Sequence, residues 1–146
     1  MTDLLPSLAL ACETTAFTLA TLDPDGSPRA TLLYFANHDR LTLYLLSDPT
    51  SPHCQNLVRE SRTGAALFPP VEDWRQIRGL QMEGHAEKVP EAERQKVMSL
   101  YPERFPVGAG LWQVVRTSEF FRFAPTWVRL IDNRLSFGHK QEWQFP

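Results

Sequence analysis

The sequence has few cysteines, no long apolar run and no basic leader, and each shortage excludes a class of protein. Only two of its 146 residues are cysteines, Cys12 and Cys54, so we expect reduced thiols in the cytoplasm instead of a disulfide scaffold. The longest apolar stretches are far shorter than the roughly 18 residues that span a bilayer, so no membrane partner is expected. Asp3 and Pro6 interrupt the apolar N-terminus, which predicts a helix and not a signal peptide.

Charge and histidine spacing exclude further classes of function. The 15 Lys and Arg residues are interspersed with 17 Asp and Glu residues, giving a net charge of −2 and a pI near 6.1. Because no basic run stands out, nucleic acid is not an expected partner. The four histidines, His38, His53, His85 and His139, lack the spacing of metal ligands, so no metal is expected. No GxSxG motif indicates a hydrolase.

The stretch from Ala16 to Leu57 organises the chain. It contains three runs rich in apolar and β-branched residues, Ala16–Asp23, Pro28–Ala36 and Leu41–Ser47, which are separated by clusters of turn residues. This pattern predicts an antiparallel meander. With no repeat and no linker, residues 1–146 are expected to form a single domain.

The remaining pattern predicts a mainly β fold, a closed antiparallel barrel of six or seven strands with peripheral helices. Period-two alternation between apolar and polar residues indicates the strands, and 3.6-residue periodicity indicates the helices. The predicted helices are Leu4–Glu13, capped by Asp3, His53–Glu60 and Glu91–Tyr101, and the further strands are Thr63–Phe68, Gln76–Val89, Phe120–Pro125 and Trp127–Asp132, with Leu135–Trp143 as a possible edge strand. Pro102–Trp112 is expected to be irregular, a short helix or a lid.

The third run leads directly into a helix, and this corner is the first candidate site. Ser47, Thr50 and Ser51 supply hydroxyl groups there, and His53 stands in the first helical turn. A helix N-terminus presents free N–H groups and a positive dipole end, which together suit a phosphate. The alternative is that these residues only form the turn and cap the helix.

The same residues carry a resemblance to a known family. The segments ATLDPDGSPRATLLYF, LYLLSD and TSPHCQNL, followed by RQIRGLQMEGHAEKV and FFRFAPTWVRLIDN, resemble the FMN-binding split-barrel family that includes pyridoxamine 5′-phosphate oxidase. The tail DNRLSFGHKQEW is most similar to a small uncharacterised branch of that family. The resemblance covers nearly the whole chain.

This resemblance implies an FMN cofactor held at the interface of a homodimer. Ring-lining positions of the family fall on Arg29, Ala30, Thr31, Leu32 and Leu33, and the phosphate site falls on Ser47, Thr50, Ser51, His53 and Asn56. The family usually has Lys or Arg where His53 stands, and a mostly neutral imidazole there implies weaker retention of FMN. Arg29 or Arg62 would supply the missing charge, or would be exposed arginines without a role.

Two residues of the long strand are candidates for contacts with the flavin ring. Gln81 would bond the pyrimidine edge through its amide. Arg78 would favour negative charge on the reduced ring, or would instead pair with Glu83 or Glu87. In the tail, Lys140 and Trp143 would reach the partner's cofactor, or would pack on their own barrel.

The resulting hypothesis is an FMN-dependent oxidoreductase that acts on a small substrate. No catalytic acid or base can be assigned, and the substrate stays unknown. RLIDNR lacks the Arg-x-His signature of true pyridoxamine-phosphate oxidases, which argues against that activity. The alternatives are a non-catalytic module that binds or sequesters a flavin, haem or deazaflavin, and a barrel that has lost its ligand and serves as an interaction scaffold.

Overall fold

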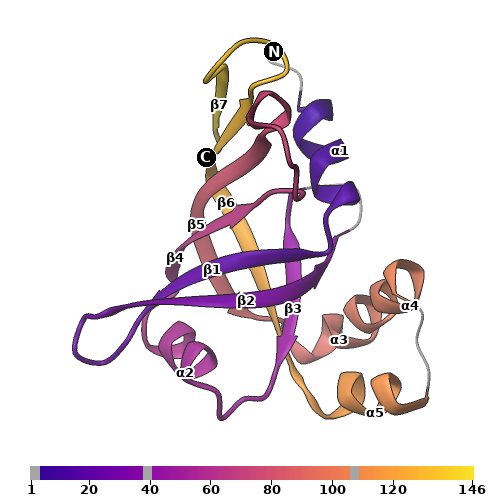
Figure 1. Cartoon of the computed structure of the whole chain (residues 1–146). Helices are drawn as coiled ribbons and strands as arrows, with labels where there is room; N and C mark the ends of the chain where they lie inside the picture. Colours follow the sequence, from indigo (N-terminus) through magenta and orange to yellow (C-terminus); the bar gives the residue numbers. More distant parts are fainter. Residues whose placement is uncertain (1–3, 38–40, 106–108) are drawn as a thin grey trace.

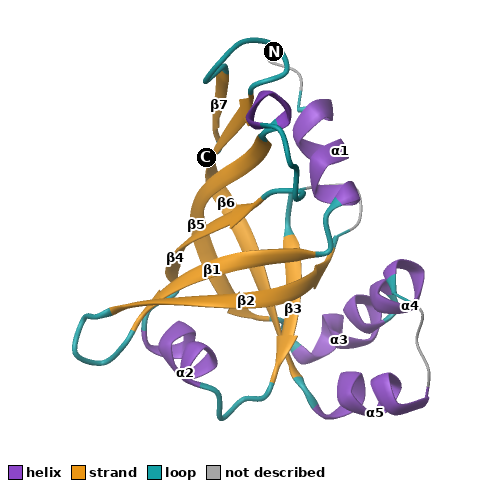
Figure 2. Ribbon diagram, in the orientation of Figure 1, coloured by secondary structure: helices purple, strands orange, loops and turns teal. Residues whose placement is uncertain are grey.

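The computed structural model describes residues 4–37, 41–105 and 109–146, and its centre is a closed β-barrel (Figures 1 and 2). The described strands form one antiparallel sheet in the order β3-β2-β1-β4-β5-β6-β7, and β3 also pairs with β6. This extra pairing closes six strands into a barrel, while β7 adds to the free side of β6. The strands are β1 (Ala16–Leu22), β2 (Pro28–Ala36), β3 (Leu43–Ser47), β4 (Arg62–Leu67), β5 (Arg78–Lys88), β6 (Glu119–Asp132) and β7 (Lys140–Gln144). The predicted mainly β barrel is confirmed.

The alternation of the first strands explains which side chains fill the barrel. In β1, Phe17 and Leu19 are buried, while Thr18 and Ala20 point outward. Successive side chains of a strand face opposite sides, so a strand with one apolar and one small or polar set separates core from surface. A tight turn joins β1 to β2, and Gly26 occupies its left-handed position at a φ of 85°.

The helices close one end of the barrel and flank its lower part. They are α1 (Leu5–Glu13), α2 (Pro52–Arg59), α3 (Glu91–Met98), α4 (Leu100–Arg104) and α5 (Ala109–Thr117), with a short 3-10 helix η1 (Trp74–Gln76). Helix α1 packs Leu10 and Ala11 into the main core, and Cys12 is exposed on it. The capping role predicted for Asp3 falls outside the described residues.

The helix predicted from Glu91 to Tyr101 is instead two helices, which break at Ser99. Pro102 explains the break, because its ring would clash with the carbonyl of Met98 in a continuous helix. The turn directs Tyr101 into a second core, where its hydroxyl donates to the carbonyl of Tyr44 at 3.0 Å. Helices α3, α4 and α5 therefore pack together beside the barrel, at the lower right of Figure 1.

The two strands predicted around Pro125 are one 14-residue strand, β6. The ladder between β5 and β6 shifts register here, since Glu83 faces Trp127 while Gly84 faces Pro125. Proline has no N–H to donate, and a bulge tolerates that loss. A single β6 then reaches from β3 at one end to β7 at the other.

Candidate functional site

The corner between β3 and α2 brings three of the predicted phosphate residues together. The His53 ring nitrogen Nε2 lies 2.8 Å from the Ser47 hydroxyl and 3.3 Å from that of Ser51. His53 is buried, and this desolvation, helped by the nearby positive charge of Arg29, lowers its pKa below the ordinary value of 6.5. The imidazole is therefore neutral at pH 7, and it is held by hydroxyl groups instead of a carboxylate.

A fourth predicted residue, Thr50, already has a hydrogen-bond acceptor within the turn before α2. The hydroxyl and the backbone N–H of Thr50 both donate to Asp48 Oδ1, at 2.7 and 2.8 Å, and Ser51 donates to the Asp48 carbonyl. No side chain caps α2. The N–H groups of its first turn, at His53 and Cys54, thus have no helical acceptor. The corner offers backbone donors and hydroxyls, but Asp48 adds a negative charge beside them.

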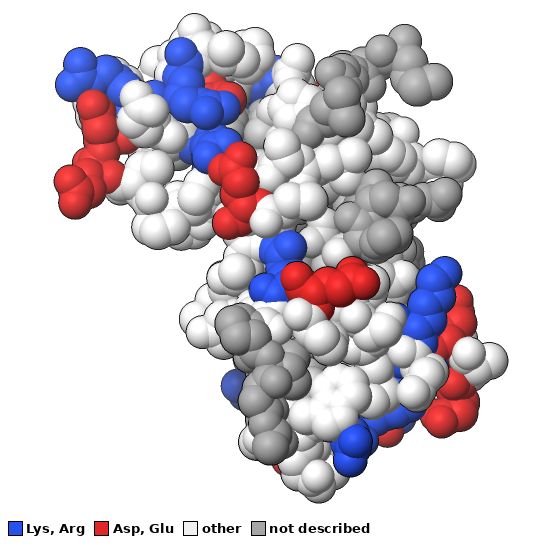
Figure 3. All heavy atoms as spheres, turned by 90° about the vertical axis from the view of Figure 1, so that its right-hand side faces the viewer, with Lys and Arg blue, Asp and Glu red and all other residues white. Residues whose placement is uncertain are grey.

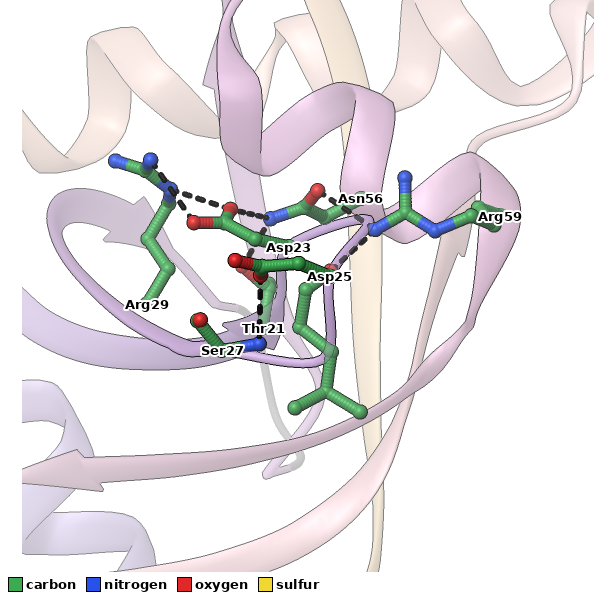
Figure 4. A network of polar contacts seen from close by, with 8 residues as sticks. Thr21, Asp23, Asp25, Ser27, Arg29, Asn56 and Arg59 are labelled. Atoms are coloured by element: carbon green, nitrogen blue, oxygen red, sulfur yellow. Dashed lines mark hydrogen bonds and ion pairs between the residues drawn. The ribbon is translucent and has the colours of Figure 1, made fainter.

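Arg29 is tied to the β1–β2 hairpin by a bidentate ion pair (Figure 4). Its Nε lies 2.7 Å from Asp23 Oδ1, and its second terminal nitrogen lies 3.1 Å from Oδ2. These bonds, with one from Asn56, lower the pKa of Asp23, and the carboxylate in turn raises that of Arg29. The cation expected to bind phosphate is therefore already partnered.

Asn56 belongs to this same network. It is buried on α2, and its Nδ2 donates to Asp23 Oδ1 at 2.8 Å and to the Thr21 hydroxyl at 3.1 Å. Its Oδ1 accepts from Arg59, which also donates to the Leu22 carbonyl. Asn56 thus links α2 to the β1–β2 hairpin, and both the nitrogen and the oxygen of its amide form hydrogen bonds within the protein.

Only part of the Arg29–Leu33 run faces outward. Ala30 and Leu32 are exposed on the outer side of β2, and Leu32 is 74% exposed. Leu33 lies in the barrel core, and Thr31 shares its side of the strand. The side chain of Leu33 therefore faces the core, and only its backbone can border a ligand on the outer side of β2.

The middle parts of the outer faces of β1 and β4 carry small side chains, which we call the outer shelf (Thr18, Ala20, Gly64 and Ala66). The larger Leu22 and Arg62 lie on the same faces at one end of this shelf. Strand register sets the shelf residues in two cross-strand rows. One row runs Leu32, Thr18, Ala66, Gln81, Arg129, and the next runs Ala30, Ala20, Gly64, Glu83, Trp127. The shelf is therefore flat, with β2 on one side and β5 and β6 on the other.

An open groove lies over this shelf. One part, of about 580 Å³, is lined by shelf residues together with Gln81, Trp127 and Arg129. A second part, of about 420 Å³, shares Ala20 and Gly64 with it and extends to the β5 bulge. Gln81 thus lies beside a flat groove, three strand spacings or about 14 Å from Leu32. Its expected bond to a flavin stays a prediction.

The other predicted contacts lie away from the corner and the shelf. Arg78 pairs with Glu13 of α1, not with Glu83 or Glu87, and it shares the barrel-facing side of β5. Trp143 is buried in the main core of its own chain, so its packing alternative is the one observed. Lys140 is exposed at the start of β7, beyond the Arg129–Glu142 ion pair at the rim of the groove.

Charge is mixed on the face that carries α1 and the lower helices. In Figure 3, blue and red groups are intermingled there, and neither sign forms a continuous patch. Within the described residues no group of three or more His, Cys, Asp or Glu side chains could hold a metal ion. Among the helices described, none has the length and apolarity that crossing a membrane requires.

Sequence reasoning missed Asp23 and the outer shelf. A signal for Asp23 was present, because a hairpin closed at Pro24–Ser27 sets Asp23 near Arg29 on the neighbouring strand. No pattern in the sequence indicated the outer shelf. Small residues on β1 and β4 become neighbours only when those two strands pair.

Comparisons with known proteins agree with this architecture. The family model described as pyridoxamine 5′-phosphate oxidase matches residues 8–132. A UPF0306 protein of Enterobacter sp. (strain 638) is 25% identical over 114 residues, covering 78% of this chain and 77% of the relative. A pyridoxine/pyridoxamine 5′-phosphate oxidase of Ralstonia pickettii is 33% identical over 132 residues, covering 89% of this chain but only 58% of that enzyme.

Solved structures share the fold. A conserved hypothetical protein from Mycobacterium tuberculosis superposes with a TM-score of 0.79 at 24% identity, covering 95% of this chain and 91% of that one. A heme binding protein from Mycobacterium smegmatis gives a TM-score of 0.77 at 19% identity, covering 92% and 55%. At these identities the likeness concerns the barrel alone.

Proposed function

This chain belongs to the pyridoxamine 5′-phosphate oxidase family, and we propose that it is an FMN-binding oxidoreductase that works as a homodimer on a small substrate. In this proposal residues 1–146 act as one domain. The flavin ring lies on the outer shelf beneath a second copy, and its phosphate lies at the corner formed by Ser47, Ser51 and His53.

One observation carries the proposal: the flat groove and the donor-rich corner are joined by the same strand. Strand β2 bears Leu32 on its outer face at the edge of the shelf and Arg29 at its hairpin end on the opposite face, toward α2. Its pairing with β3 is described only at Phe35 and Ala36, so a ligand can pass around the edge of β2 between the two faces. Three residues of extended strand separate Arg29 from Leu32 by about 10 Å. A ligand with a planar apolar body and an anionic end, linked by a short chain, matches this arrangement.

The residues present fit the phosphate of FMN through hydrogen-bond donors more than through charge. Hydroxyl groups, the backbone N–H groups of α2 and Arg29 converge from three segments. His53 is neutral, however, and Arg29 is bonded to Asp23. We therefore expect FMN to bind reversibly. Bound flavin would supply two-electron redox chemistry, while the protein would orient it and exclude water.

The arginines near the tail do not favour a phosphorylated pyridoxamine substrate. Arg129 pairs with Glu142, and Arg134 forms a bidentate pair with the buried Asp132. Both guanidinium groups would have to share or give up a carboxylate before they could bind the phosphate of a substrate, and no donor-rich corner lies beside them in the part of the chain that the structure describes. We assign no general acid or base.

A second candidate is a non-catalytic module for a planar ligand such as haem or a deazaflavin. The observation in its favour is His85, whose exposed ring borders the groove and bonds only Ser61, at 3.2 Å, among the described residues. If haem were bound on the shelf, the accessible imidazole of His85 would be the residue to hold its iron.

Titration of the full-length chain with FMN tests the proposal. We expect saturable quenching of flavin fluorescence with one FMN per chain, and native mass spectrometry should record a dimer that carries two. Riboflavin is the control for the phosphate, and haemin is the probe for the second candidate. No response to FMN refutes the proposal, and a Soret band with haemin in that case supports the alternative.

A further inference from the structure

The carboxylate of Asp23 occupies the guanidinium of Arg29 in the way a phosphate would. Both of its oxygens accept from Arg29, at 2.7 and 3.1 Å. Asp23 takes the Nε–H and one terminal N–H of a guanidinium that has five N–H donors, and its charge offsets the positive charge that would attract a phosphate. While Asp23 holds it, Arg29 can offer a ligand only its remaining terminal N–H groups, and with a partly neutralised charge.

Asp23 accepts a further hydrogen bond from α2, which an ordinary surface ion pair lacks. Asn56 on α2 donates to the same carboxylate, and Thr21 and Arg59 hold the Asn56 amide in turn (Figure 4). The Asp23 side chain is 23% exposed and that of Arg29 is 41% exposed. The carboxylate is therefore preorganised, while the arginine retains access to solvent.

The pair borders an open pocket beside the corner. This cavity of about 340 Å³ is lined by the hairpin and by the outward face of α2, including Pro52 and Gln55 of its first two turns. An anion bound at the N-terminus of α2 would thus lie near both Arg29 and the Asp23 carboxylate. The negative charge of Asp23 would repel this anion.

We propose that Asp23 is a built-in competitor for the ligand's phosphate, which holds Arg29 in the free protein and keeps flavin phosphate exchangeable. This inference rests on the proposed function. Binding requires Arg29 to exchange one carboxylate oxygen for a phosphate oxygen, or to share its donors between the two. Affinity for the phosphate is set by this exchange, whereas contacts of the ring with the outer shelf are unaffected by it.

The hairpin offers a matched control in Asp25. Its carboxylate accepts from the Ser27 N–H at 2.9 Å and lines the same pocket, so Asp25→Asn removes the same charge from the same hairpin. Asp23→Asn frees Arg29, while its side-chain oxygen can still accept from Asn56. Dissociation constants for FMN and riboflavin would be measured for each variant.

We expect Asp23→Asn to tighten FMN about tenfold, the size of one charge-assisted hydrogen bond, and to change riboflavin less than twofold. Asp25→Asn should change both less than twofold. Adding Asp23→Asn to Arg29→Gln should leave FMN affinity unchanged, because no guanidinium remains to be freed.

Three results overturn the inference. The first is FMN binding that is equal or weaker in Asp23→Asn, the second is an equal effect of Asp25→Asn, and the third is a gain that persists without Arg29. Thermal denaturation checks folding, and Asp23→Ser repeats the test if the Asn variant is unstable. If no variant binds either flavin, the proposed function itself falls, and the inference with it.

Discussion

At the scale of single residues, His53 has the neutral imidazole that its sequence position led us to expect. Burial and the charge of Arg29 lower its pKa, so in the free protein it takes up a proton only well below its ordinary value of 6.5. The unfolded chain binds that proton more readily, and the free protein therefore loses stability as the pH falls through 6.5. A bound phosphate acts in the opposite direction by favouring the imidazolium.

This difference gives a pH-dependent affinity. Phosphate binding raises the pKa of His53, so between the free and bound pKa values FMN binding takes up a proton and tightens as the pH falls. We expect FMN affinity to rise by up to about tenfold per pH unit between pH 7.5 and 6. Fluorescence titration at several pH values measures it.

Two controls isolate the imidazole. His53→Gln keeps a polar group of similar length beside Ser47 but cannot titrate, so the difference between its pH profile and that of the native protein removes the titration of the phosphate itself. Riboflavin should give a flat profile. Equal slopes for the native protein and His53→Gln would show that His53 takes no part.

At the scale of elements, the β5–β6 pairing depends on a glycine. A Cβ added at Gly84 would lie 2.2 Å from the Ala124 carbonyl oxygen and 2.8 Å from Pro125 Cα. Both contacts are with backbone, which cannot rotate away. The bulge that lets a proline sit within β6 therefore requires glycine on the opposite strand.

Replacing this residue should be costly. We expect Gly84→Ala to lower the free energy of unfolding by roughly 3 kcal/mol, because the two longest strands must separate locally to admit the methyl group. Urea denaturation followed by circular dichroism measures this loss.

The control for this substitution is Gly110→Ala on α5. A Cβ at Gly110 would meet nothing within 4 Å, so its stability should stay the same or rise slightly. Equal stability of Gly84→Ala and the native protein would mean that the bulge relaxes without cost.

At the scale of the whole molecule, large apolar side chains remain on the outside of the barrel. Leu32, Tyr34 and Phe68 are each more than 65% exposed. A contiguous exposed apolar face is typical of an interaction site. Leu32 also borders the outer shelf, so the proposed dimer and the proposed ring site share this surface.

Leu32→Glu tests that joint role. A carboxylate buried between two copies would be desolvated without a partner, so we expect monomers and at least tenfold weaker FMN binding. Light scattering after size-exclusion chromatography measures the assembly. Val114→Glu on α5, which changes a half-exposed residue remote from the shelf in sequence and fold, should leave both properties unchanged. If Leu32→Glu stays a dimer and binds FMN with normal affinity, Leu32 belongs neither to the dimer interface nor to the ring site.

The sequence by itself determined most of the local elements and the corner where β3 leads into α2, but not the break at Ser99 or the continuity of β6. Alternation gave β2 from Pro28 to Ala36 as observed, and it gave the two faces of β5, because side-chain direction in a strand depends only on position. Proline and hydroxyl residues similarly marked the start of α2, since helix termini are set within a few residues.

Only the tertiary structure decided which distant groups meet. Strand pairing placed Thr18 beside Ala66 and made the shelf, and the packing of α2 against the hairpin brought Asn56 to Asp23. Closure of the barrel buried Trp143 in its own core. Such partners lie tens of residues apart, and their contact depends on the register and closure of the sheet, which no local pattern specifies.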